Sequence, residues 1–146
     1  MSSIEENIRS IRSRMAAAAE RAGRDVGEVM LVGASKMNDA AACQAAIRAG
    51  IDALGENRVQ EMTAKLQEHA YDGAPLHFIG HLQRNKVRQV VGVVSLIQSA
   101  GSWELLEEIE RQAEKKELIQ DVLLEVNIGG EEILEVHHPP GDRRKD

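Results

Sequence analysis

The chain has 146 residues, a formal net charge of −6 and 42% hydrophobic residues, which suits one globular domain with a real core. With a single Phe, Tyr and Trp it lacks stacking platforms for single-stranded nucleic acid, and its negative charge argues against binding to a phosphate backbone. One cysteine excludes an internal disulfide, and no apolar run approaches the ~20 residues of a membrane span. We therefore expect a cytoplasmic protein without nucleic-acid or membrane partners.

The first predicted element is a helix that Ser3 caps and Gly23 ends. Apolar residues recur along it at spacings of three and four, the period of one helix face: Ile4, Ile8, Ile11, Met15, Ala18 and Ala22. This helix precedes the first predicted strand, so it is an extra N-terminal element.

Short apolar runs then alternate with helical patterns. The predicted strands are 30–34, 53–55, 76–79, 94–98 and 121–128, and the predicted helices are 39–49, 58–69, 85–91 and one that Ser102 caps. This alternation is typical of parallel βαβ units. Two architectures fit the pattern, a five-stranded open sheet of the flavodoxin-like kind and a part of a (β/α)₈ barrel. Length favours the open sheet, because a whole barrel normally needs at least ~200 residues.

Polar residues follow the ends of four predicted strands: Ser35-Lys36, Glu56-Asn57, Gly80-His81 and Asn127. Because the carboxyl ends of parallel strands meet at one edge of a sheet, these residues are expected to share a pocket. Lys36 has two interpretations. It is either a solvated residue at a strand end or an amine for Schiff-base chemistry, which needs a partly desolvated lysine with an accessible neutral form.

Other common motifs are absent from the sequence. It contains no GxGxxG, GxxxxGK[ST] or GxSxG pattern, which excludes the usual dinucleotide, P-loop and hydrolase-elbow sites. His77 and His81 are four residues apart, but they flank a predicted strand, so we expect no zinc site. The basic segment 83–88 at a helix start fits either a phosphate contact or an ordinary solvated face.

Taken together, four segments resemble the pyridoxal-phosphate homeostasis protein family, the alanine-racemase-like proteins that bind pyridoxal 5′-phosphate (PLP): LVGASK at 31–36, GENRVQE at 55–61, HFIGHLQRNK at 77–86 and VNI at 126–128. The resemblance covers about residues 3–131. It implies a TIM barrel like the N-terminal domain of alanine racemase, with PLP held as a Schiff base on Lys36. It also implies that Asn57 lines the cofactor pocket, with His81 and Asn127 near it. Family members generally show no robust racemase or transaminase turnover, and they are thought to hold and hand over PLP in vitamin B6 and amino-acid balance.

The sequence departs from the family pattern after Ile128. In the family, three further βα units follow, and their late Ser/Gly-rich loops grip the phosphate. We therefore expect residues 1–130 to form an incomplete PLP-binding barrel of about five parallel strands and 131–146 to be an unrelated, disordered tail, as a truncated or frameshifted reading frame would produce. Family members are monomers, but the open sheet edges of such a fragment favour self-association, and PLP binding is expected to be weak.

Three functions fit the sequence. The first is a non-catalytic PLP-binding homeostasis protein with Lys36 as the Schiff-base lysine. The second is a PLP-dependent amino-acid racemase, which would need a further acid/base residue opposite Lys36. The third is an open α/β module that binds a small anion at its strand ends. Strand order separates the third from the others, because an open sheet reverses its order and a barrel keeps neighbours sequential.

Overall fold

The computed structural model describes residues 3–130, so the tail predicted at 131–146 lies outside the described residues. The elements follow one another as α1 (Ile4–Arg21), η1 (Val26–Glu28), β1 (Val32–Ala34), α2 (Ala40–Arg48), β2 (Ala53–Glu56), α3 (Val59–Gln67), β3 (Leu76–Phe78), η2 (Arg84–Lys86), α4 (Val87–Val90), β4 (Leu96–Ala100), α5 (Trp103–Lys115) and β5 (Val122–Leu124). Strands and helices alternate after α1, as the sequence predicts.

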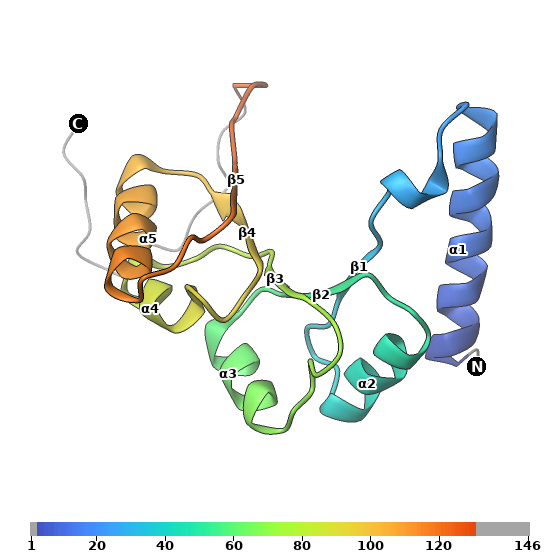
Figure 1. The fold of residues 1–146 in the computed structure, drawn as a ribbon, viewed down its shortest axis with the longest axis horizontal. Coiled ribbons are helices and arrows are strands. Elements are labelled where there is room, and N and C mark those ends of the chain that lie inside the picture. Colours follow the sequence, from blue (N-terminus) through green and yellow to red (C-terminus); the bar gives the residue numbers. More distant parts are fainter. Residues whose placement is uncertain (1–2, 131–146) are drawn as a thin grey trace.

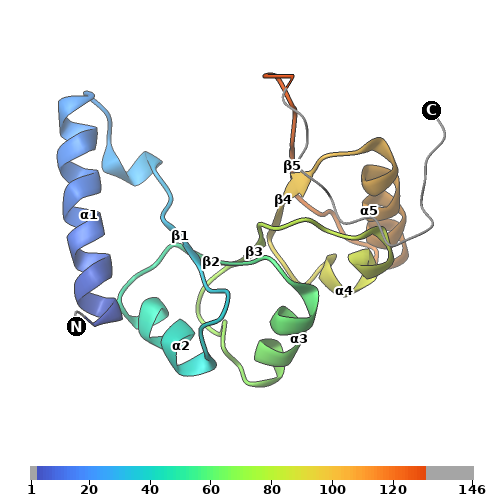
Figure 2. The same ribbon diagram turned by 180° about the vertical axis from the view of Figure 1, so that it is seen from behind.

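The strands form one parallel sheet in the order β1-β2-β3-β4-β5. The sheet is curved, and helices α2 to α5 lie along its convex side (Figure 1). The view from behind shows that no helix of the described chain covers the concave face (Figure 2). Sequential neighbours and helices on one side are the arrangement of a barrel. The open sheet that chain length favoured is therefore wrong, and the fold is a five-stranded part of a (β/α)₈ barrel.

Local sequence signals set the helix boundaries. Ser3 and Glu6 form a reciprocal capping box at the start of α1. Asp39 caps α2, with its carboxylate accepting from the Ala42 backbone at 2.8 Å. Gly50 follows α2 with a φ of 86°, a left-handed conformation that costs glycine little. These ends lie within a residue or two of the predicted ones.

Helix α1 packs on α2, and only part of its predicted apolar stripe is buried. Ile8 is buried, whereas Ile4 and Ile11 are exposed. Arg12 on the same helix forms an ion pair with Asp52 at 3.0 Å, and Asp52 also accepts from the Leu31 backbone at 2.6 Å. The hydrogen bond from Arg12 holds the pKa of the Asp52 carboxyl below its usual range. This ion pair links α1 to the loops around β1.

The core lies between the sheet and its helices and is almost wholly aliphatic. Its most deeply buried side chains include Leu54, Met62, Phe78, Leu82, Val87, Val90 and Ile97. The last strand is the exception: β5 is three residues long where eight were predicted, and Leu124 is 63% exposed. β5 is an edge strand of the described sheet, so it has a strand partner on one side only. No helix within residues 3–130 is long and apolar enough to cross a bilayer.

Candidate functional site

A small pocket lies at the carboxyl ends of β1, β2 and β3. Its volume is about 230 Å³, and it is lined by Ala34, Lys36, Gly55, Asn57, Ile79 and Gly80. The strand register explains the set, because Ala34 pairs with Gly55 across the sheet. Side chains alternate along a strand, so Lys36 and Asn57, each two residues further on, face the same side. The sheet therefore brings together the two site residues that the sequence places after β1 and β2.

Two glycines shape this pocket. A Cβ at Gly80 would lie 2.5 Å from the Asn57 Cβ and 2.6 Å from its carbonyl oxygen, which is closer than real atoms approach. A Cβ at Gly55 would lie 2.8 Å from the end of the Ile79 side chain. Glycine thus allows the backbone after β3 to pass directly against Asn57. The Oδ1 atom of Asn57 is buried without a hydrogen-bond partner, so it can accept a hydrogen bond from a ligand.

Lys36 lies in a tight turn between β1 and α2. The Asn38 N–H donates to the Ser35 carbonyl at 3.1 Å, and the Asn38 side chain donates to the Lys36 carbonyl at 3.0 Å. Met37 has a φ of 62°, a left-handed conformation that is uncommon for a residue with a side chain. Lys36 itself is exposed. The turn therefore presents its side chain outside the helix-covered core.

A charged cluster lies on the other side of the sheet, beneath this turn. The Oε1 atom of Glu56, a fully buried residue, accepts from Ser35 Oγ at 2.7 Å, Lys65 Nζ at 2.7 Å and Tyr71 OH at 2.8 Å. Lys65 also donates to the Ser35 carbonyl at 2.7 Å and pairs with Glu61 at 3.0 Å. β2 and α3 thus hold the residue that precedes Lys36.

Hydrogen bonds and burial shift the pKa values of Lys65, Glu61 and Tyr71. Burial alone would lower the pKa of the Lys65 ammonium, but its hydrogen bonds to Glu56 and Glu61 outweigh this effect and raise it. The hydrogen bond from Lys65 lowers the pKa of the Glu61 carboxyl. Burial, and then the bond to Glu56, raise the pKa of the Tyr71 hydroxyl. Lys65 therefore stays a cation and Tyr71 a neutral donor.

The other two predicted site residues lie elsewhere. His81 follows Gly80 directly but is exposed and does not line the pocket. Asn127 lies beyond the end of β5 and is also exposed. The structure thus brings Lys36 and Asn57 together and leaves His81 and Asn127 outside the lining. Their assignment to the cofactor site stays a prediction.

Residues 1–133 match the family model described as alanine racemase, N-terminal domain. The chain belongs to this family. The resemblance predicted from the strand-end motifs is confirmed, since a pyridoxal phosphate homeostasis protein of Aquifex aeolicus is 41% identical over 127 residues, which are 87% of this chain and 56% of that protein.

Two solved structures of similar proteins agree with the fold of this member of the alanine racemase N-terminal domain family. A protein from Bifidobacterium adolescentis is 40% identical, with a TM-score of 0.80 over 88% of this chain and 56% of its own. PipY of Synechococcus elongatus, solved with PLP bound, is 35% identical, with a TM-score of 0.68 over 81% of this chain and 55% of its own. The chain spans a little over half the length of these relatives.

The prediction from the sequence did not include Lys65 and Tyr71, nor Glu56 as the acceptor of their hydrogen bonds. In the structure, Lys65 is buried on α3 together with Val59 and Met62. One signal was present: Lys65 continues the spacing of three from Val59 and Met62. A glutamate at the end of a buried strand is the natural partner for such a lysine.

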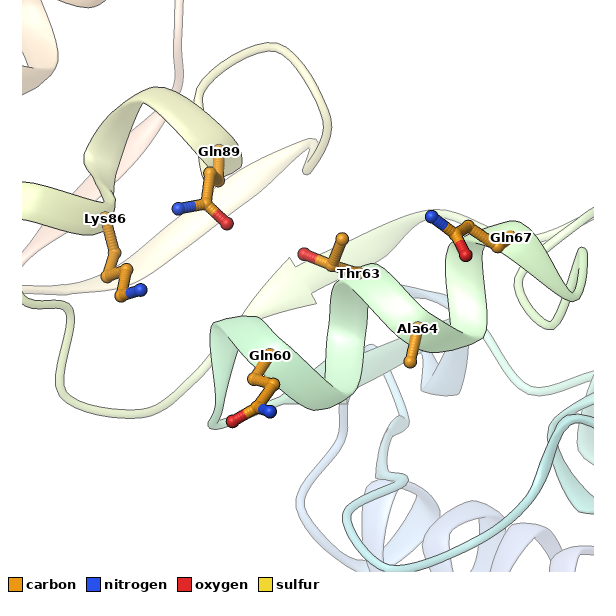
Figure 3. Close-up of a pocket in the computed structure, with 6 residues that line it drawn as sticks. All are labelled: Gln60, Thr63, Ala64, Gln67, Lys86 and Gln89. Atoms are coloured by element: carbon orange, nitrogen blue, oxygen red, sulfur yellow. The ribbon is translucent and has the colours of Figure 1, made fainter.

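A larger hollow of about 540 Å³ lies between α3 and the η2–α4 segment. Figure 3 shows the side chains that line it, which are mostly long and polar: Gln60, Thr63, Ala64, Gln67, Lys86 and Gln89. It belongs to the helix layer and shares no residue with the pocket around Lys36. Since η2 has only three residues, the predicted phosphate contact at this basic segment gains no support from a helix N-terminus.

His77 on β3 supplies a pH-dependent contribution to stability. It is buried, its Nδ1 lies 2.9 Å from the Gln98 side-chain nitrogen, and burial lowers its pKa below the ordinary value of 6.5. The unfolded chain then binds a proton more readily than the folded one, so stability is lost as pH falls below 6.5 toward the lowered pKa. We expect His77→Gln to lose less stability than the wild type as the pH falls below 6.5, measured by urea unfolding.

The exposed His81→Gln variant is the control and should follow the wild-type curve. Equal pH dependence in the wild type and His77→Gln would contradict the prediction.

Proposed function

We propose that the chain binds PLP through a Schiff base on Lys36 and takes part in PLP and amino-acid homeostasis without turnover of its own. The observation that carries this proposal is the pocket that Lys36 and Asn57 line together, in which the Oδ1 atom of Asn57 is buried without a hydrogen-bond partner. Two relatives support it. One is by name a pyridoxal phosphate homeostasis protein, and the PipY structure contains PLP.

The residues of the pocket fit the aldehyde end of PLP. Lys36 would supply the amine for a Schiff base, and PLP, when bound, would supply the aldehyde. Asn57 offers a buried acceptor beside that amine, and His81 and Asn127 belong to the proposal as further contacts. Lys36 is the one charged residue among the six that line the pocket, so a phosphate gains no second cation there. We therefore propose weak binding, by a domain of residues 1–130.

We also propose that the protein is located in the cytoplasm. Cys43 is a free, buried thiol, which suits the reducing conditions of the cytoplasm.

The test is covalent capture. We expect incubation with PLP followed by borohydride reduction to label Lys36 in preference to other lysines, as read by peptide mass spectrometry. Lys36→Ala should abolish that labelled peptide and the visible absorbance of the PLP complex. Asn57→Ala should reduce both by about tenfold, since losing a buried hydrogen bond costs about 1–3 kcal/mol.

Lys115→Ala, at the exposed end of α5, is the matched control for loss of a lysine and should change neither readout. Equal labelling of Lys36 and Lys115 in the wild type would reject the proposal.

We further propose that the β5 edge drives self-association. Leu124 on this strand is 63% exposed and Val126 beyond it 68% exposed. An uncovered edge with apolar side chains is a template for pairing with another chain. We expect concentration-dependent association in analytical ultracentrifugation and a lower association constant for Leu124→Lys. A wild type that stays monomeric at every concentration would contradict this expectation.

A further inference from the structure

The backbone of the turn that carries Lys36 is held by groups from β2 and α3. The Ser35 N–H donates to the Gly55 carbonyl at 2.9 Å. The Ser35 carbonyl accepts from Lys65 Nζ at 2.7 Å, and the Met37 N–H donates to Glu61 Oε1 at 2.5 Å. The turn is therefore fixed on both sides of Lys36 by residues distant in sequence.

Because side chains alternate along a strand, this anchoring also sets the side of the sheet to which Lys36 points. The Ser35 hydroxyl bonds to Glu56, which points toward the helices, so the next residue, Lys36, faces the opposite side and lines the pocket. A shift or rotation at Ser35 would change the direction of the Lys36 side chain relative to the pocket that it lines with Asn57. Met37 keeps its left-handed φ of 62° while its N–H is bonded to Glu61.

Burial of the charged Lys65 side chain on α3 carries a free-energy cost. Lys65 continues the buried face of α3 after Val59 and Met62, where its ammonium loses most of its hydration. Its side chain is 8% exposed, and its ammonium contacts Glu56, Glu61 and the Ser35 carbonyl. All three partners belong to or contact the lysine turn, since Glu56 also accepts from the Ser35 hydroxyl and Glu61 from the Met37 N–H.

We propose that Lys65, held by Glu56 and Glu61, is a positioning residue for Lys36 that acts through the Ser35–Met37 backbone. This inference rests on the proposed function, since it takes Lys36 as the residue that reacts with PLP. Lys65 touches the turn and not the pocket, so its role is to orient the amine and not to react.

Two readouts on the full chain test the inference. The first is the rate at which PLP is trapped on Lys36 by borohydride, under conditions where each variant is folded. The second needs no PLP and is amide hydrogen exchange at Met37 and Asn38. We expect Lys65→Met to slow trapping by about 10- to 100-fold, because a misplacement of about 1 Å can cost 100-fold. We also expect it to speed exchange at both amides.

Tyr71→Phe is the matched control. It removes a hydrogen bond to Glu56 without touching residues 35–37, so it should lower stability while leaving trapping and exchange unchanged. If Lys65→Met does not fold, the double variant Glu56→Gln/Lys65→Met removes both charges together and should show the same two effects.

Trapping at the wild-type rate in folded Lys65→Met, or equal losses in Tyr71→Phe, would overturn the inference. If the wild type itself traps no PLP on Lys36, the proposed function fails. Amide exchange then decides the positioning role alone: faster exchange in Lys65→Met supports it, and unchanged exchange overturns it.

Discussion

Lys65→Met is expected to lower the free energy of unfolding by about 3–5 kcal/mol, because it leaves the fully buried Glu56 carboxylate without its cation. The second oxygen of Glu56 is already buried without a hydrogen-bond partner, so the protein has no spare donor at hand. Since domains of this size are stable by only about 5–15 kcal/mol, the loss should be visible as a large fall in the urea midpoint.

A double-mutant cycle separates the ion pair from the packing of the lysine stem. Glu56→Gln/Lys65→Met removes both charges and should be more stable than Lys65→Met alone, because no unpaired carboxylate remains in the core. Lys115→Met, on the exposed end of α5, should be neutral within about 0.5 kcal/mol. A Lys65→Met variant as stable as the wild type would show that Glu56 gains solvent or a new donor.

The helix boundaries and the existence of all five strands could be predicted from the sequence, because caps such as Ser3, Asp39 and Ser102 act through neighbouring backbone groups. The architecture could not be decided from length. An open sheet and a part of a barrel show the same alternation of strands and helices along the sequence. They differ in the order in which the strands lie side by side, and that order is a property of the folded sheet. The strand order β1 to β5 supplied that answer.

The extent of β5 shows a second limit. Residues 121–128 are apolar enough to predict a long buried strand, but only Val122–Leu124 pairs with β4 in the structure. Strand formation depends on what packs against both faces and edges, and β5 is an edge of the described sheet. The hydrophobic pattern of one segment does not show how many of its residues pair with a neighbouring strand.

Half of the site followed from the rule that parallel strands end at one edge. Lys36 and Asn57 meet because they occupy the same register after β1 and β2. The charged cluster that holds the Lys36 turn could not be predicted from this rule. By its sequence, Lys65 looks like a solvated helix residue, and its partner Ser35 lies thirty residues earlier. Long-range pairing of polar groups is decided by the packing of α3 on the sheet.

Gly80→Ala is expected to damage the pocket at the ends of β1 to β3 more than the size of one methyl group suggests. The added Cβ would lie 2.5 Å from the Asn57 Cβ and 2.6 Å from its Cα, so a rotamer change of Asn57 cannot relieve the contact. Gly80 is also held in place, because its carbonyl accepts from the Ser99 hydroxyl and the preceding Ile79 N–H donates to the Glu56 backbone carbonyl. Either Asn57 or the end of β3 must move, at a cost of about 1–3 kcal/mol.

The displacement should reach function because Asn57 carries the buried acceptor beside Lys36. We expect the yield of PLP trapped on Lys36 to fall by about tenfold or more in Gly80→Ala, in line with the cost of misplacing a reacting group. Gly101→Ala is the control, since its nearest neighbour would lie 3.6 Å from the new Cβ, an ordinary contact. If Gly80→Ala binds and traps PLP as the wild type does, Asn57 is not a cofactor contact, and the pocket at the ends of β1 to β3 depends on Lys36 alone.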